Sequence, residues 1–199
     1  MNDPVGWLRE VRIATTTTTP GVASICAAVA GEPIAGSWWG HPEGQRIWRA
    51  LMTITESGEA LECRLLGRVT WLHRSLWPAF ATVVADKDYR AWARERVGEE
   101  ARELLDLVEA EREIPAKEAG ERLGWGKSKL ARLRRSLQVH LLVANREVHM
   151  PEGHHVLFLA KWSIDVAEKK PTVADAIAIL VEACGTAETV LREFRGRSV

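Results

Sequence analysis

The sequence has no surplus of charge of either sign, because 27 lysine and arginine residues balance 27 aspartate and glutamate residues. A protein without net charge has no global electrostatic field that draws it toward nucleic acid or an anionic membrane. Any attraction to a polyanion must therefore come from local clusters of basic residues.

Cysteine is scarce. The three cysteines, Cys26, Cys63 and Cys184, are far apart and form no CxxC pair. This pattern argues against a disulfide framework and against a thiolate zinc site, and it fits a reducing compartment. Each cysteine lies among apolar neighbours, so we expect all three to be small buried hydrophobic residues.

Long apolar runs are also missing. No stretch approaches the ~18 consecutive apolar residues of a membrane span. The first residues, MNDPVGWLREVR, are charged and lack the apolar core of a signal peptide. We therefore expect a cytoplasmic protein with no membrane partner. A chain of 199 residues buries about 70% of its unfolded surface, which is enough to build a core without disulfides or metal.

The hydrophobic pattern predicts a mostly α, α+β protein in four parts. Residues 1–19, which end in ATTTTT, are predicted to be an arm or linker. Residues 20–86 are predicted to be a helical domain with a β-hairpin, compatible with a winged-helix-like unit. Residues 87–162 are predicted to be a winged helix-turn-helix. Residues 163–199 are predicted to form two C-terminal helices, with packing or homodimerisation as their role.

Within residues 20–86, the pattern predicts helix, helix, hairpin and helix. GVASICAAVAG reads as a short helix closed by Gly31, because glycine suits a left-handed C-terminal cap. Ile47, Leu51 and Ile54 recur at helical spacing and predict one buried face. ALECRLL and RVTWLH are rich in β-branched or apolar residues around Gly67, which predicts two strands.

The stretch IPAKEAGERLGWGKSKLARLRRSLQ carries the most information about function. Pro115 is placed to begin a helix, the GWG sequence at 124–126 makes a short turn, and a second helix follows over residues 127–138. Two short helices joined by a glycine-containing turn of three or four residues are typical of a helix-turn-helix. REVHM and HHVLFLA then flank a Pro-Glu-Gly turn, which predicts a hairpin in the position of a wing.

The second helix carries no acidic residue and five basic ones: Lys127, Lys129, Arg132, Arg134 and Arg135. Leu130, Leu133 and Leu137 recur at i, i+3 and i+7 and would anchor it to the core. At 100° per residue, Arg132 and Arg135 then project from the opposite face. Arginine can form two hydrogen bonds to guanine O6 and N7, and lysine neutralises phosphate. This pattern therefore predicts a recognition helix for duplex DNA. The plainer interpretation is a solvated basic surface.

Histidines cluster at the predicted hairpin tip. His149 and His154 are candidate phosphate contacts at the wing tip, beside His155. With Glu152 they would supply two imidazoles and a carboxylate, short of three well-placed zinc ligands. No HExxH or PCxxC motif is present, so we predict no metal and no cofactor.

An alternative function rests on two distinctive strings in the first half, GSWWGHPEG and RVTWLHRSLWPA. Together they would line a pocket of polar and aromatic residues: Trp38, Trp39, His41, His73 and Arg74. The pocket would belong to an enzyme acting on nucleic acid, such as a DNA-repair enzyme. Two adjacent tryptophans cannot both face the same way in an extended segment, so we expect one in the core and one exposed. A further alternative is a protein-interaction module that uses the C-terminal helices.

These strings, with EVHMPEGHH before a tryptophan, resemble an uncharacterised bacterial family over most of residues 30–162. In that family lysine often stands where this chain has Arg68. A looser similarity is to bacterial winged-helix DNA glycosylases, whose paired-polar catalytic strand this chain lacks. The resemblance implies a winged-helix fold and a nucleic-acid partner without assigning catalytic residues. The leading prediction is therefore a non-catalytic, regulatory or accessory protein that binds duplex DNA.

Overall fold

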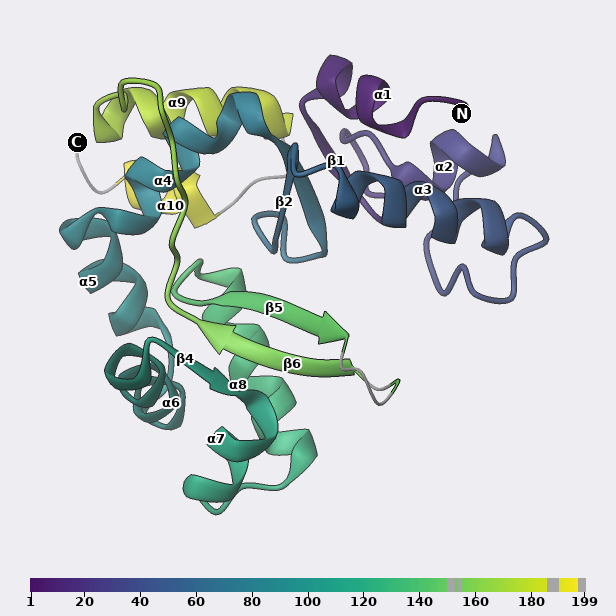
Figure 1. Cartoon of the computed structure of the whole chain (residues 1–199). Helices are drawn as coiled ribbons and strands as arrows, with labels where there is room; N and C mark the ends of the chain where they lie inside the picture. Colours follow the sequence, from purple (N-terminus) through teal and green to yellow (C-terminus); the bar gives the residue numbers. More distant parts are fainter. Residues whose placement is uncertain (150–152, 154, 186–189, 197–199) are drawn as a thin grey trace. The chain divides into compact units, whose positions relative to one another are not determined.

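The computed structural model describes residues 1–149, 153, 155–185 and 190–196. The chain forms two compact units (Figure 1). The first unit comprises Met1–Val83 and Val166–Val199, and the second comprises Val84–Asp165. Each contains helices and a three-stranded antiparallel sheet, so the protein belongs to the α+β class. Within the described residues, no helix combines the length and the apolar character that a membrane span requires.

The prediction of an arm or linker at the start of the chain is wrong. The first residues form helix α1 (Pro4–Val11) and strand β1 (Ile13–Thr15). All three residues of β1 are buried, and the strand pairs with β3 of the hairpin. Of the threonine-rich sequence only Thr15 belongs to the strand, where a β-branched side chain packs well on the pleated surface, and residues 16–18 follow it outside the strand. The Thr15 hydroxyl is satisfied because it donates to the Thr17 carbonyl at 2.7 Å.

Two predicted helices of the first half are confirmed. Helix α2 (Ile25–Ala30) ends at Gly31, whose φ of 81° is the left-handed conformation expected of a glycine cap. Helix α3 (Gly44–Glu56) buries Ile47 and Ile54 completely. Together with α1, these helices enclose one hydrophobic core.

The predicted hairpin is also confirmed. Strand β2 (Ala60–Cys63) pairs antiparallel with β3 (Thr70–His73), and Gly67 in the connection has a φ of 68°. The sheet order is β1-β3-β2, so β1 pairs with the edge of β3 that β2 leaves open. A 3₁₀ helix (Arg74–Leu76) then leads into the predicted helix α4 (Trp77–Ala85).

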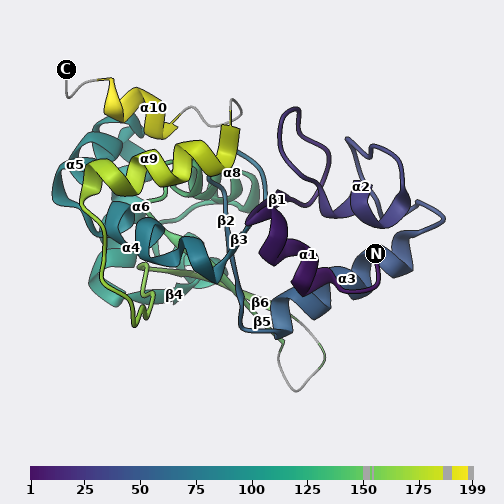
Figure 2. The same ribbon diagram turned by 90° about the horizontal axis from the view of Figure 1, so that it is seen from above.

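The C-terminal segment belongs to the first unit rather than forming a separate tail. Its predicted helices are α9 (Val173–Cys184), capped by Thr172, and α10 (Val190–Arg195). Figures 1 and 2 both draw α9 alongside α4, and the Thr82 hydroxyl of α4 donates to the Pro171 carbonyl at 3.5 Å. Five residues on the apolar face of α9 are buried: Ala176, Ile177, Leu180, Val181 and Cys184.

The second unit begins with two helices where the sequence reads as one amphipathic segment. Helix α5 (Lys87–Arg96) is separated from α6 (Glu99–Glu111) at Val97, whose backbone is extended, and Gly98. The apolar stripe of α6 is buried, with four residues in the core: Ala101, Leu104, Leu105 and Val108.

The rest of the second unit follows the predicted order of helix, turn, helix and hairpin. Helix α7 (Ala116–Arg122) and helix α8 (Lys127–Val139) precede β5 (Ala144–His149) and β6 (His155–Ala160). The sequence did not predict β4 (Glu113–Pro115), a three-residue strand between α6 and α7 that pairs with β6. The sheet order is therefore β4-β6-β5.

Candidate nucleic-acid interface

The turn between α7 and α8 is built on glycine. Gly124 has a φ of 67°, and the Trp125 amide donates to the Gly120 carbonyl at 2.7 Å. A Cβ at Gly120 would lie 3.1 Å from a methyl carbon of Leu130 and 3.3 Å from the Trp125 carbonyl oxygen. The absence of a side chain at Gly120 therefore allows α7 to approach the start of α8 closely.

Helix α8 is divided into an apolar and a basic face, as predicted. Leu130, Leu133 and Leu137 are buried, with exposed fractions of 8%, 4% and 0%. Arg132 and Arg135, on the opposite side of the helix, are exposed. Since the leucines hold the helix in place, the two arginine side chains reach solvent from a fixed position.

The remaining cations of α8 differ in their surroundings. Lys127 is exposed and forms no ion pair with any described residue. Lys129 and Arg134 are half-buried, at the edges of the face that meets the core. The Lys129 ammonium also lies 4.5 Å from the centre of the Trp125 ring, a distance at which the cation is attracted to the ring face.

A carboxylate that sequence reasoning missed lies beside this basic helix. Glu100, in the first turn of α6, accepts from the Lys129 ammonium at 2.5 Å and from the Arg132 guanidinium at 3.3 Å. These contacts, Lys129 first, hold the pKa of Glu100 below its ordinary value. Glu100 and Lys129 are 29 positions apart, so only the packing of α6 on α8 brings them together.

The structure describes only some of the residues that were predicted for the wing. His149 is paired with His155 in the register of the hairpin, while His154 lies outside the described residues. His155 Nδ1 lies 3.5 Å from the carboxylate of Glu147 on β5. In the part of the chain that the structure describes, no group of three histidine, cysteine or acidic side chains is arranged to hold a metal ion.

The hairpin also carries a basic residue on its surface. Arg146 of β5 donates to the carboxylate of Glu113 on β4 at 2.7 Å and lies 5.0 Å from the centre of the Phe158 ring. Hydrogen bonding to Arg146 lowers the pKa of Glu113 from its ordinary value. Arg146 therefore links the three strands of the sheet and is not an unpaired cation.

The two tryptophans of GSWWGHPEG stack on each other, with ring centres 4.2 Å apart. Trp38 is half-buried against the core of the first unit, and Trp39 is 70% exposed. One core anchor and one exposed ring were predicted, but the expectation that they face opposite ways is wrong. The segment turns before α3, where the His41 amide donates to the Trp38 carbonyl, so the two rings can meet.

The histidines of the predicted pocket bind different carboxylates. His41 Nε2 lies 3.0 Å from Glu32, and its Nδ1 accepts from the Glu43 amide at 3.1 Å. No hydrogen bond, ion pair or ring contact between described residues joins Trp38, Trp39 or His41 to His73 or Arg74. The pocket shared by all five residues is therefore not observed.

His73 belongs to a separate polar cluster at the end of β3. It is 6% exposed, its Nδ1 accepts from the Ser75 amide, and its Nε2 lies 3.3 Å from Glu59. Glu59 also accepts from Arg9 of α1 at 3.0 Å. The Arg74 amide donates to the Glu59 carbonyl at 2.8 Å, and Arg74 itself is exposed. The arrangement joins α1, β3 and Glu59, the residue before β2, which is a structural task for His73.

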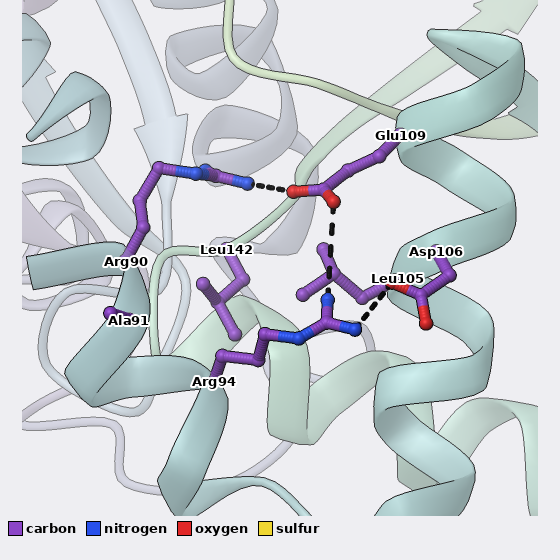
Figure 3. Close-up of a pocket in the computed structure, with 7 residues that line it drawn as sticks. All are labelled: Arg90, Ala91, Arg94, Leu105, Asp106, Glu109 and Leu142. Atoms are coloured by element: carbon purple, nitrogen blue, oxygen red, sulfur yellow. Dashed lines mark hydrogen bonds and ion pairs between the residues drawn. The ribbon is translucent and has the colours of Figure 1, made fainter. Parts of the chain in front are cut away.

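A cavity of about 320 Å³ lies between α5 and α6 in the second unit (Figure 3). Arg90 and Arg94 extend from α5, and Asp106 and Glu109 from α6, above apolar side chains that include Leu142. Arg90 pairs with Glu109, and Arg94 pairs with Asp106 at 2.5 Å. The opposite charges that line the cavity therefore already neutralise each other.

Comparisons with known protein families, with curated proteins and with solved structures found no match to this chain.

Proposed function

We propose that the second unit is a winged helix-turn-helix that binds duplex DNA, with α8 in the major groove and the β5–β6 hairpin as the wing. The observation that carries the proposal is the exposed basic face of α8. Lys127, Arg132 and Arg135 reach solvent from a helix that has no acidic residue and is fixed by buried leucines.

The order of elements supports the same proposal. Helix α6 is followed by strand β4, helices α7 and α8, and the hairpin. Strand β4 pairs with β6, which ties the start of the helix-turn-helix to the hairpin after it. A second helix after a glycine-containing turn is the element that enters the major groove in helix-turn-helix proteins.

The proposal assigns different tasks to the basic residues. Arg132 and Arg135 point away from the core and are placed to reach base edges, where a guanidinium forks guanine O6 and N7. Lys127, Lys129 and Arg134 lie nearer the ends or edges of the helix and are assigned to phosphates, which set affinity without reading sequence. We also assign His149 and His154 to phosphate contacts.

A binding assay with a fluorescent duplex, titrated with salt, tests this proposal. Arg132→Ala/Arg135→Ala should weaken binding at low salt at least tenfold, since each lost guanine fork costs about 1–3 kcal/mol. The matched control is Arg46→Ala/Arg49→Ala on α3, which removes two exposed arginines and the same charge from the other unit. Absence of duplex binding by the wild-type protein, or equal binding by the two double variants, would overturn the proposal.

A further inference from the structure

We propose that Glu100 competes with DNA for two cations of α8, Lys129 and Arg132, and thereby lowers the affinity of α8 for duplex DNA. This inference rests on the proposed function of α8 and names a residue that tunes it. It concerns a residue outside the helix-turn-helix, at the first turn of α6.

The geometry of Glu100 resembles that of a bound phosphate group. One carboxylate oxygen is 2.5 Å from Lys129 Nζ, and the other is 3.3 Å from a terminal nitrogen of Arg132. The side chains of Glu100 and Arg132 are 48% and 67% exposed, so an incoming polyanion can reach the pair from solvent. A phosphate that binds Lys129 and a guanine that binds Arg132 would therefore compete with this carboxylate for the same cations.

The carboxylate that holds these cations comes from a different helix. Helix α8 has no acidic residue of its own, and an ion pair within one helix would give only local support. Glu100 reaches across from α6 and joins the half-buried Lys129 to the exposed Arg132. A single carboxylate thus restrains one cation assigned to phosphate and one assigned to a base edge.

The expected size of the effect is modest. An exposed ion pair shifts an equilibrium constant by about one- to fivefold. At the middle of that range, two pairs that share one carboxylate should together change DNA affinity about three- to tenfold. Removing the carboxylate while leaving both cations in place should therefore make the protein bind duplex more tightly.

Glu99 provides a matched control. It is exposed, lies next to Glu100 in the same first turn of α6, and forms no ion pair with any described residue. Glu99→Gln and Glu100→Gln remove the same charge from the same helix end, so both lose the same favourable interaction with the helix dipole. Any difference in DNA binding between them reports the contacts of Glu100 with α8.

The experiment measures duplex affinity at one low salt concentration for the wild type, Glu99→Gln and Glu100→Gln. We expect Glu100→Gln to bind about three- to tenfold more tightly than wild type, and Glu99→Gln to differ from wild type by less than twofold. In a Lys129→Ala/Arg132→Ala background, which retains residual binding through the other cations, the advantage of Glu100→Gln should disappear. Glu100→Ala, with urea denaturation of each variant, provides a second test if the glutamine variant is poorly folded.

Failure of the inference differs from failure of the proposed function. If the wild type binds duplex but Glu100→Gln and Glu100→Ala bind no more tightly than Glu99→Gln, Glu100 is not a competitor, and the assignment of α8 stands. If none of these proteins binds duplex at low salt, the assignment of α8 fails and the inference fails with it.

Discussion

The phenol of Tyr89 on α5 donates a hydrogen bond to the carbonyl of His140, 3.1 Å away, just past the end of α8. Tyr89 is completely buried. Carbonyl groups at a helix C-terminus have no partner within the helix, and a buried one must find another donor. Tyr89 therefore fixes the end of the candidate recognition helix to α5.

Tyr89→Phe should lower the free energy of unfolding by about 1 kcal/mol, because it removes the donor and leaves the His140 carbonyl without this partner. Urea denaturation followed by circular dichroism measures the change. The control is Ser128→Ala, an exposed hydroxyl on α8 that forms no hydrogen bond with a described residue, and it should alter stability by less than about 0.5 kcal/mol. An unchanged unfolding midpoint in the phenylalanine variant would contradict the assigned role of this hydrogen bond.

Neighbouring residues on α8 should differ sharply in their contribution to stability. Leu133 is 4% exposed, so Leu133→Ala should cost about 2–4 kcal/mol through lost burial and the cavity it leaves. Arg132→Ala changes an exposed side chain and an exposed ion pair, so it should cost less than about 1 kcal/mol. Urea denaturation of the two variants under identical conditions makes the comparison, and equal losses would refute the assigned orientation of α8.

Hydrophobic periodicity predicted the helices and the two hairpins because those signals are local. The spacing of Leu130, Leu133 and Leu137 is enough to orient α8, whichever element packs against it. Strand β1 and strand β4 were missed because three-residue strands carry almost no periodic signal, and each is defined by pairing with a distant strand. The break at Val97 is likewise invisible in a continuous amphipathic pattern.

The ion pairs of Glu59 predict a specific pH dependence of stability. Hydrogen bonds from Arg9, and then from His73, lower the pKa of Glu59 from its ordinary value. A carboxyl group with a lowered pKa in the folded state stabilises the protein above its unfolded-state pKa of about 4.3. That contribution is lost as the pH falls through the lower folded-state pKa.

Glu59→Gln should therefore be less stable than wild type at pH 7, and the difference between them should shrink as the pH falls below about 4.3. Unfolding midpoints in urea, measured from pH 7 to pH 3, give the two curves. Glu56→Gln is a suitable control, since Glu56 is exposed at the end of α3 and forms no ion pair with a described residue. Parallel curves for wild type and Glu59→Gln would show that ionisation of Glu59 does not stabilise the folded protein.

The three cysteines should be unreactive in the folded protein. Cys26, Cys63 and Cys184 are all buried, as predicted from their apolar neighbours. Burial raises the pKa of Cys26 to about 11 and also raises the pKa of Cys63, so little thiolate is present at neutral pH. A thiol-specific chromogenic reagent at pH 7.5 should label the native protein slowly and the denatured protein at all three positions. Rapid labelling of the native protein would contradict this packing.

In the candidate site, as in the fold, local features were predictable from the sequence and contacts between distant residues were not. The exposure of Arg132 and Arg135 follows from helical geometry, and it is observed. The Glu100 contact could not be foreseen, because it depends on how α6 crosses α8 and joins residues far apart in the chain. The grouping of His41 with His73 is not observed for a related reason: distinctive strings do not specify which distant side chains meet.

The tasks proposed for Lys127 and Arg135 lead to different binding profiles. Lys127 is exposed at the first turn of α8 and is assigned to phosphate. Lys127→Ala should weaken binding to all duplexes alike and reduce the slope of log affinity against log salt by about 1, because one fewer phosphate is neutralised. Arg135→Ala should instead weaken binding to the preferred sequence by about 1–3 kcal/mol and leave binding to unrelated duplexes less affected. A selection from random duplexes supplies the preferred sequence, and salt titrations on that duplex and on a scrambled one measure both effects. If the two variants lose affinity equally on both duplexes with the same change in slope, α8 contacts only the DNA backbone, and the assignment of Arg135 to a base edge is wrong.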